Sequence, residues 1–277
     1  MQSQIIRILR ALHAWAFLGL CLPIALRTGE YLQTSVDPGH SPAEDLWFIA
    51  LINPFRSMDP TKGFIRLWIA ILLVGTLAAQ RHRFKWVILV PWMMLLCLVD
   101  FHGSLNDVSL GFLGWMTISL AWIHPSDWNL HEKLKRYTPV AWAVFGLSYT
   151  SSGYSKWALG PSWRSGNALK FIMENDLFAR PIFTLWIAKM PESLLHALTW
   201  SSLFIEIAAL PLVLWKRTRA VTWFALSFLQ LSLALLLDFG VLNWAVLLFH
   251  AWVAGCELAT NPPHWLQTSR RHSAASP

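Results

Sequence analysis

The sequence predicts an all-α fold, a polytopic bundle of about eight transmembrane helices with interfacial or re-entrant helices in two outer loops. Composition is the first reason: of 277 residues, 55% are hydrophobic and 13% are charged, whereas a soluble domain has about a quarter charged residues. The second reason is that the apolar residues form long continuous runs between polar segments. These runs do not alternate as the strands of a membrane barrel do, so helices must satisfy the backbone within the bilayer.

Eight apolar runs are candidate spans, close to the ~20 residues that a membrane helix needs. They are residues 11–26, 64–79, 86–99, 109–123, 138–159, 193–215, 220–237 and 240–256. They place one transmembrane domain at residues 1–258, followed by a polar tail at 259–277. Two shorter apolar stretches, 43–55 and 178–190, are expected to be interfacial or re-entrant helices, or loops with anchoring aromatic residues. No cleavage site follows the first run, which indicates a retained helix rather than a signal peptide.

The basic residues predict the orientation. They concentrate in the segments that share one side of an eight-span topology: 1–10, 80–85, 124–137, 216–219 and 257–277. The short turns of the other side, 100–108 and 238–239, contain no Lys or Arg. Because cytoplasmic loops are rich in Lys and Arg, we expect both termini in the cytoplasm and an integral location in a bacterial inner membrane. The net charge of +7 thus reports topology, and no nucleic-acid partner is expected.

Cysteine and histidine patterns do not indicate a metal site. Cys21, Cys97 and Cys256 lie in or at the ends of apolar runs, without metal-binding spacing. The polar turn at 99–107, "VDFHGSLND", also lacks a standard ligand pattern. His124 and His131, both in the basic segment 124–137, are expected to contact lipid headgroups.

A lysine near the end of the fifth run is the first candidate functional residue. Ser148, Ser152 and Lys156 recur every four residues and share one helix face. In a membrane helix such a polar stripe should face the protein interior or a wet cavity. Alternatively, Lys156 extends to the outer interface and the serines only allow close packing. Partial burial would make the amine a usable base near neutral pH, whereas a nearby carboxylate would keep it protonated.

Glu206 is the second candidate, because it lies deep in the run 193–215. A lone carboxylate there costs roughly 2.5–3.5 kcal/mol on insertion scales, so it must be paired, protonated or hydrated. Thr199 and Ser202 share its helix face. Further polar residues of the last two runs are Gln230, Asn243 and His250. These residues predict either a hydrogen-bonded network that holds the bundle together or an intramembrane pocket for a partly polar ligand.

One segment resembles a known family. "GYSKWALGPSWRSGNAL" followed by "NDLFARP" is similar to the signature of the HTTM family, the membrane domain shared with vitamin K-dependent γ-carboxylase. The matching positions are Gly153, Lys156, Trp163, Gly166, Leu177, Phe178, Pro181, Glu206 and Gly240. The resemblance covers most of the chain and is specific over residues 145–245.

The resemblance implies a quinone-like cofactor, with Lys156 as the catalytic base that deprotonates a vitamin K-like hydroquinone on the extracytoplasmic side. It implies a cofactor site made by Tyr154, Trp157, Trp163, Glu206 and Gln230. Gln230 stands where the carboxylase has a histidine, and no counterpart of its large β-rich luminal domain is found, which implies a different substrate. Two other functions stay open: a maturation or accessory factor for a secreted peptide, and a structural subunit of a membrane complex.

Overall fold

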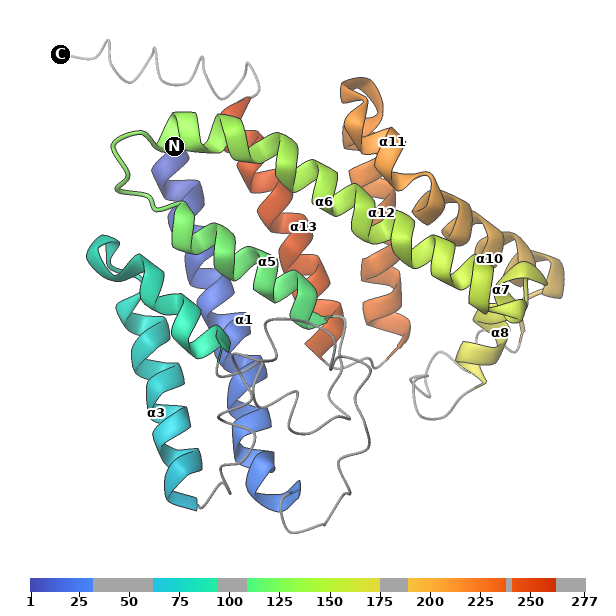
Figure 1. Ribbon diagram of the computed structural model, residues 1–277. Helices are drawn as coiled ribbons and strands as arrows, with labels where there is room; N and C mark the ends of the chain where they lie inside the picture. Colours follow the sequence, from blue (N-terminus) through green and yellow to red (C-terminus); the bar gives the residue numbers. More distant parts are fainter. Residues whose placement is uncertain (32–61, 94–108, 175–188, 238–240, 263–277) are drawn as a thin grey trace. The chain divides into compact units, whose positions relative to one another are not determined.

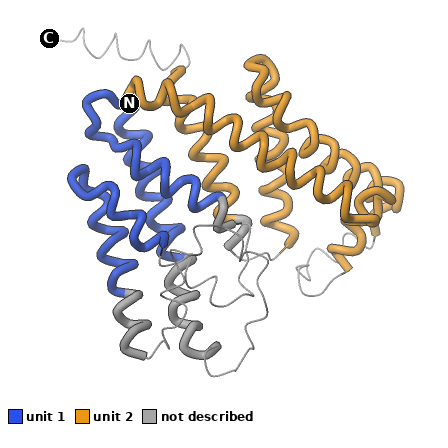
Figure 2. Tube along the Cα trace, viewed as in Figure 1, with its two compact units in different colours: residues 1–130 blue, residues 131–277 orange. Residues whose placement is uncertain are grey.

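A computed structural model describes residues 1–31, 62–93, 109–174, 189–237 and 241–262 of the chain (Figure 1). The elements assigned within these ranges are all helices, which confirms the predicted all-α class. The residues group into two compact units, unit 1 at 1–130 and unit 2 at 131–277 (Figure 2).

Unit 1 contains α1 (Gln2–Tyr31), α3 (Lys62–Ala78), the 3₁₀ helix η2 (His82–Ile88) and α5 (Ser109–Trp122). α1 packs against α3 and α5, and η2 packs against α3 and α5. Phe17, Leu72 and Leu113 are buried in the core. Gly114 allows the ring of Trp92 to approach α5, because a Cβ atom there would lie 2.3 Å from Trp92 Cζ2.

Unit 2 contains α6 (Leu130–Leu159), α7 (Pro161–Arg164) and α8 (Ala168–Met173). The first residue of α6, Leu130, is counted in unit 1. It continues with α10 (Glu192–Ile207), α11 (Ala209–Leu214), α12 (Lys216–Leu236) and α13 (Val241–Thr260). The fifth apolar run predicts a helix over 138–159, but α6 already begins at Leu130 and so includes part of the basic segment 124–137. The reason is helical spacing: Leu130, Leu134 and Tyr137 are buried along one stripe, which draws the charged residues between them into the helix.

Among the described helices, α12 is the one that is both long and apolar enough to cross a membrane. The segments Phe112–Trp122 and Trp244–Thr260 are apolar but shorter. α12 also exposes Phe224, Phe228 and Leu235 along one side, a surface suited to lipid rather than to water. The structure therefore supports a membrane-spanning segment in this chain.

Several expected features lie outside the described residues. They are the stretch 43–55, the turn 100–108, residues 178–188 of the second interfacial stretch, and the tail from 263 onward. The third apolar run, 86–99, is described only as far as residue 93. Its first residues, 86–88, belong to η2.

Candidate functional site

The two candidate residues meet between α6 and α10 in unit 2. Lys156 Nζ lies 2.6 Å from both carboxylate oxygens of Glu206. Ser152 Oγ donates to the same carboxylate at 3.4 Å. Glu206 is 3% exposed, and the Lys156 side chain is 27% exposed. Two members of the polar stripe of α6, Ser152 and Lys156, therefore face the protein interior at α10, and the buried carboxylate is paired with a lysine.

An aromatic ring is the third partner of Lys156. Its Nζ atom lies 4.7 Å from the ring centroid of Trp163 on α7, a cation–π contact. Gly160 makes this approach possible, because a Cβ atom there would lie 2.7 Å from Trp163 Cδ1. The carboxylate and the indole face both stabilise a positive charge, so the resting arrangement holds Lys156 as an ammonium ion.

The helix that carries Glu206 breaks directly after it, between α10 and α11. Pro211 has no N–H group for the carbonyl of Ile207, four residues earlier. The hydroxyl of Thr150 on α6 donates to this carbonyl at 3.1 Å and accepts from the Leu210 N–H at 3.0 Å. A side chain of α6 is thus inserted into the hydrogen-bond ladder of the broken helix, and it fixes the break beside Glu206.

Two glycines let α6 approach this region closely. A Cβ atom at Gly153 would lie 2.8 Å from the backbone nitrogen of Ile207, and one at Gly146 would lie 2.7 Å from Leu210 Cα. The glycines are seven residues apart, on the same face of α6 as Lys156. Small residues at such spacing allow backbone contact between membrane helices, so they set the distance across which Lys156 reaches Glu206.

The connection after α6 is anchored on the first half of α10. Gly166 adopts φ +83°, a left-handed conformation that favours glycine. Next to it, His196 Nε2 donates to Asn167 Oδ1 at 2.8 Å. Trp200 Nε1 donates to the Arg164 carbonyl at 3.3 Å. These contacts hold the segment that carries Trp163.

The other predicted cofactor residues have different surroundings. Tyr154 and Trp157 are exposed, at 65% and 43% of their surfaces. Gln230 is buried on α12. Their participation in a cofactor site stays a prediction.

A second polar cluster joins α6, α12 and α13. The Tyr149 hydroxyl lies 2.6 Å from His250 Nε2, and Ser227 Oγ lies 2.7 Å from His250 Nδ1. His250 is 2% exposed. The rings of Phe145 and His250 pack edge to face, with their centroids 4.7 Å apart. The sequence pattern had pointed His250 inward but did not identify Ser227, since the partner of an inward polar group depends on helix packing.

A third cluster occurs nearer the start of α6. Glu257 Oε2 on α13 accepts hydrogen bonds from Trp142 Nε1 at 2.7 Å and from Arg219 Nη1 at 3.1 Å. The Arg219 guanidinium also lies 5.1 Å from the Trp142 ring centroid. Trp142 and Lys156 are 14 residues apart, about 21 Å along a helix. α6 therefore makes polar contacts with neighbouring helices at two well-separated positions along its length.

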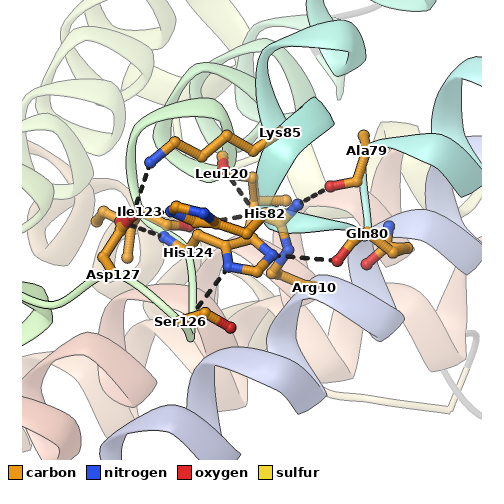
Figure 3. Close-up of polar contacts among 10 residues, drawn as sticks. All are labelled: Arg10, Ala79, Gln80, His82, Lys85, Leu120, Ile123, His124, Ser126 and Asp127. Atoms are coloured by element: carbon orange, nitrogen blue, oxygen red, sulfur yellow. Dashed lines mark hydrogen bonds and ion pairs between the residues drawn. The ribbon is translucent and has the colours of Figure 1, made fainter.

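Unit 1 has its own buried cation, which the sequence analysis had assigned to a cytoplasmic segment. The Arg10 guanidinium of α1 donates to the carbonyls of Ala79, Leu120 (2.6 Å) and Ile123 (3.2 Å) (Figure 3). These carbonyls lie at the C-terminal ends of α3 and α5, where no further N–H group of the helix is available. A cation is also favoured there by the helix dipole.

The expectation that His124 contacts lipid headgroups is wrong. His124 is 5% exposed, and its Nε2 donates to the Gln80 carbonyl at 3.1 Å. The backbone N–H of Ser126 donates to its Nδ1 at 3.1 Å. Burial lowers the pKa of His124 from its usual 6.5, which agrees with a neutral ring that accepts at one nitrogen and donates at the other.

Within the described parts of the chain, no three His, Cys, Asp or Glu side chains converge as metal ligands would. The chain matches no protein-family model, no curated protein and no solved structure.

Proposed function

We propose that the chain is an integral membrane protein of the HTTM type, with about eight spans and both termini in the cytoplasm. Its function is to bind a lipid-soluble, quinone-like cofactor at an extracytoplasmic site around Lys156 and Glu206. The observation that carries the proposal is the lysine held at 2.6 Å from a buried carboxylate and beside the Trp163 ring.

The helix directions within each unit support this topology. In unit 1, Arg10 near the start of α1 contacts the ends of α3 and α5, so α1 runs opposite to both. In unit 2, α6 runs antiparallel to the continuous path of α10 and α11, because Gly146 approaches Leu210 whereas Gly153, seven residues later, approaches Ile207. Both arrangements fit a chain that crosses the bilayer back and forth.

The residues present fit a flat ligand with an ionisable oxygen. Lys156 has three N–H donors, and two of them are engaged by the two oxygens of Glu206. The amine is partly exposed, so its third N–H group can donate a hydrogen bond to a ligand oxygen. Trp163 offers an aromatic face beside it. A bound hydroquinone would supply an acidic hydroxyl at this point.

The ion pair defines how the proton would move. In the resting pair, Lys156 carries a proton and Glu206 does not. For Lys156 to act as the base, Nζ passes a proton to the Glu206 carboxylate and accepts one from the ligand hydroxyl. The pair then holds one additional proton, on Glu206, and the ammonium group of Lys156 neutralises the ligand oxygen.

A structural role is the second candidate, and the close packing around the pair favours it. The inserted hydroxyl of Thr150 and the contact at Gly153 show that α6 and α10 are closely interlocked here. In that case the pair only holds two helices together. This role is consistent with a subunit of a membrane complex, or with an accessory factor for a secreted peptide.

Substitution of Lys156 separates the two roles. We would titrate the detergent-solubilised full chain with 2-methyl-1,4-naphthohydroquinone without oxygen, and follow the absorbance of the bound probe against pH. The native chain should ionise the probe at lower pH than solvent does. Lys156→Ala should abolish this shift, because the ionised probe loses the cation that neutralises it. Lys156→Arg should reduce it, because a guanidinium holds the Glu206 carboxylate in a bidentate pair and so opposes its taking up the proton. Glu206→Gln should fold and weaken the shift.

Matched controls come from a surface ion pair. Lys170 pairs with Glu192 at 3.5 Å, and its side chain is 41% exposed, so Lys170→Arg and Lys170→Ala should behave like the parent. If Lys156→Arg retains the full shift, Lys156 is an anchor or a structural cation. If the native chain does not bind the probe at all, the quinone-like ligand is rejected.

A further inference from the structure

One end of unit 1 is a preassembled surface, formed by residues 79–88 and 123–129 and called here the basic end. Asp127 holds it together: Oδ1 lies 2.8 Å from Lys85 Nζ and 2.8 Å from His82 Nε2, while Oδ2 accepts from the His124 N–H at 2.9 Å. Figure 3 shows these contacts beside those of Arg10. The two segments are thus fixed to each other by buried polar contacts.

The exposed charge of the basic end is positive. Arg81 and Arg83 have exposed side chains. Asp127 is the sole acidic residue in the sequence of 62–93 and 109–130, and its side chain is only 4% exposed because Lys85 and His82 cover it. The outward-facing arginines therefore have no exposed acid from these segments beside them.

Large aromatic side chains lie on the same end. Trp128 is 95% exposed, Trp86 is 53% exposed and Phe84 is 42% exposed. The Arg83 guanidinium lies 5.7 Å from the Phe84 ring centroid. Fully exposed indole rings are unusual in water, whereas tryptophan is enriched where a membrane meets water.

The helices that lead to the basic end expose aliphatic residues. On α3, Val74 and Leu77 are 66% and 62% exposed, one turn before the helix ends. On α1, Trp15 is 77% exposed, five residues after Arg10 in the first part of the apolar run 11–26. From α3 into η2, the exposed side chains thus change from aliphatic to cationic and aromatic, as they do from the hydrocarbon to the headgroup region of a bilayer.

We propose that the basic end binds the headgroup phosphates of anionic phospholipids, with Arg81 and Arg83 as the phosphate contacts. Trp128 and Phe84 lie in the interface beside them. The aliphatic side chains of α3 that precede the arginines favour lipid, because one lipid molecule offers hydrocarbon to the aliphatic residues and a phosphate to the arginines. This surface belongs to unit 1 and is independent of any cofactor at Lys156.

The test compares lipid retention by charge variants. The full chain, purified in a neutral detergent, would be incubated with equal amounts of phosphatidylglycerol and phosphatidylcholine of the same chain length. Native mass spectrometry then counts the retained lipids. The native chain should retain phosphatidylglycerol preferentially, and the double variant Arg81→Gln/Arg83→Gln should bind it roughly tenfold or more weakly. Phosphatidylcholine retention should not change.

The control removes two exposed cations from α6, in Lys135→Gln/Arg136→Gln. This variant has the same net charge and should keep the native preference. Equal losses in both variants would show a general charge effect and overturn the proposal, as would an unchanged preference in Arg81→Gln/Arg83→Gln. Glycerol phosphate at matched concentration should not displace the lipid. Complete displacement would mean that the surface binds soluble anions rather than lipid.

Discussion

At the scale of single residues, the surroundings of Lys156 and Arg10 depend on their hydrogen-bonding partners rather than on their positions along the sequence. Lys156 and Arg10 both lie near the predicted ends of apolar runs, where a cation ordinarily extends to the interface. Instead, Lys156 is paired with Glu206, and Arg10 is 3% exposed. Each is compensated by oxygen atoms from segments far away in the sequence, 50 residues away for Glu206 and 110 residues for the Leu120 carbonyl.

We predict that Arg10→Ala destabilises unit 1. Removing the guanidinium leaves buried carbonyls of α3 and α5 without a donor, and an unsatisfied buried polar group costs about 1–3 kcal/mol. The midpoint of chemical unfolding in neutral detergent, followed by circular dichroism, measures the loss. Arg7→Ala, at an exposed position of the same helix, is the matched control. Equal midpoints for the two variants would contradict a structural role for Arg10.

At the scale of elements, the local sequence explains where α6 begins and where α10 breaks. The buried stripe of Leu130, Leu134 and Tyr137 extends α6 through a basic segment. Pro211 removes a donor from the ladder, and Thr150 replaces it from the neighbouring helix. The two elements then lie close enough for backbone contact at Gly146 and Gly153.

We predict that Gly153→Val separates α6 from α10. Its side chain would enter the space now occupied by the backbone of Ile207 and by Glu206 Cβ, and overpacking typically costs 1–3 kcal/mol, so we expect a loss of about that size. Thermal unfolding of the purified chain would measure it. Ser155→Val changes an exposed position of the same helix and should leave the unfolding temperature near that of the parent. An unchanged unfolding temperature in Gly153→Val would mean that the helices are farther apart than described.

At the scale of the whole molecule, the chain forms two compact helical units. Unit 1 contains the buried cation Arg10, and unit 2 contains the buried carboxylate Glu206 paired with Lys156. The predicted single transmembrane domain at 1–258 and the eight-span topology stay predictions, since among the described helices α12 alone meets the length and composition of a span. Within unit 2, α7 follows the C-terminal end of α6, and α12 begins directly after α11.

We predict that the ends of unit 2 lie on opposite sides of the membrane. A cysteine introduced by Ser165→Cys, after α7, should react with a membrane-impermeant maleimide added to intact cells. One introduced by Lys216→Cys, at the start of α12, should react only after the membrane is opened. Both positions are exposed, so accessibility to the reagent is decided by the bilayer, and the unmodified chain reports the native cysteines. Labelling of both positions from the outside would reject the proposed topology.

The sequence by itself determined the helical class, most of the helix positions and the two residues of the candidate site. These depend on local properties: hydrophobic runs must satisfy their backbone hydrogen bonds internally, and a carboxylate among apolar residues requires a partner. The tertiary structure decided which partner is used. It brought Lys156 rather than a more distant cation to Glu206, turned Tyr154 and Trp157 outward, and buried Arg10 and His124. These contacts join residues far apart in the sequence, 44 positions for His124 and Gln80 and 50 for Lys156 and Glu206. They depend on how closely helices approach each other, which no single segment specifies.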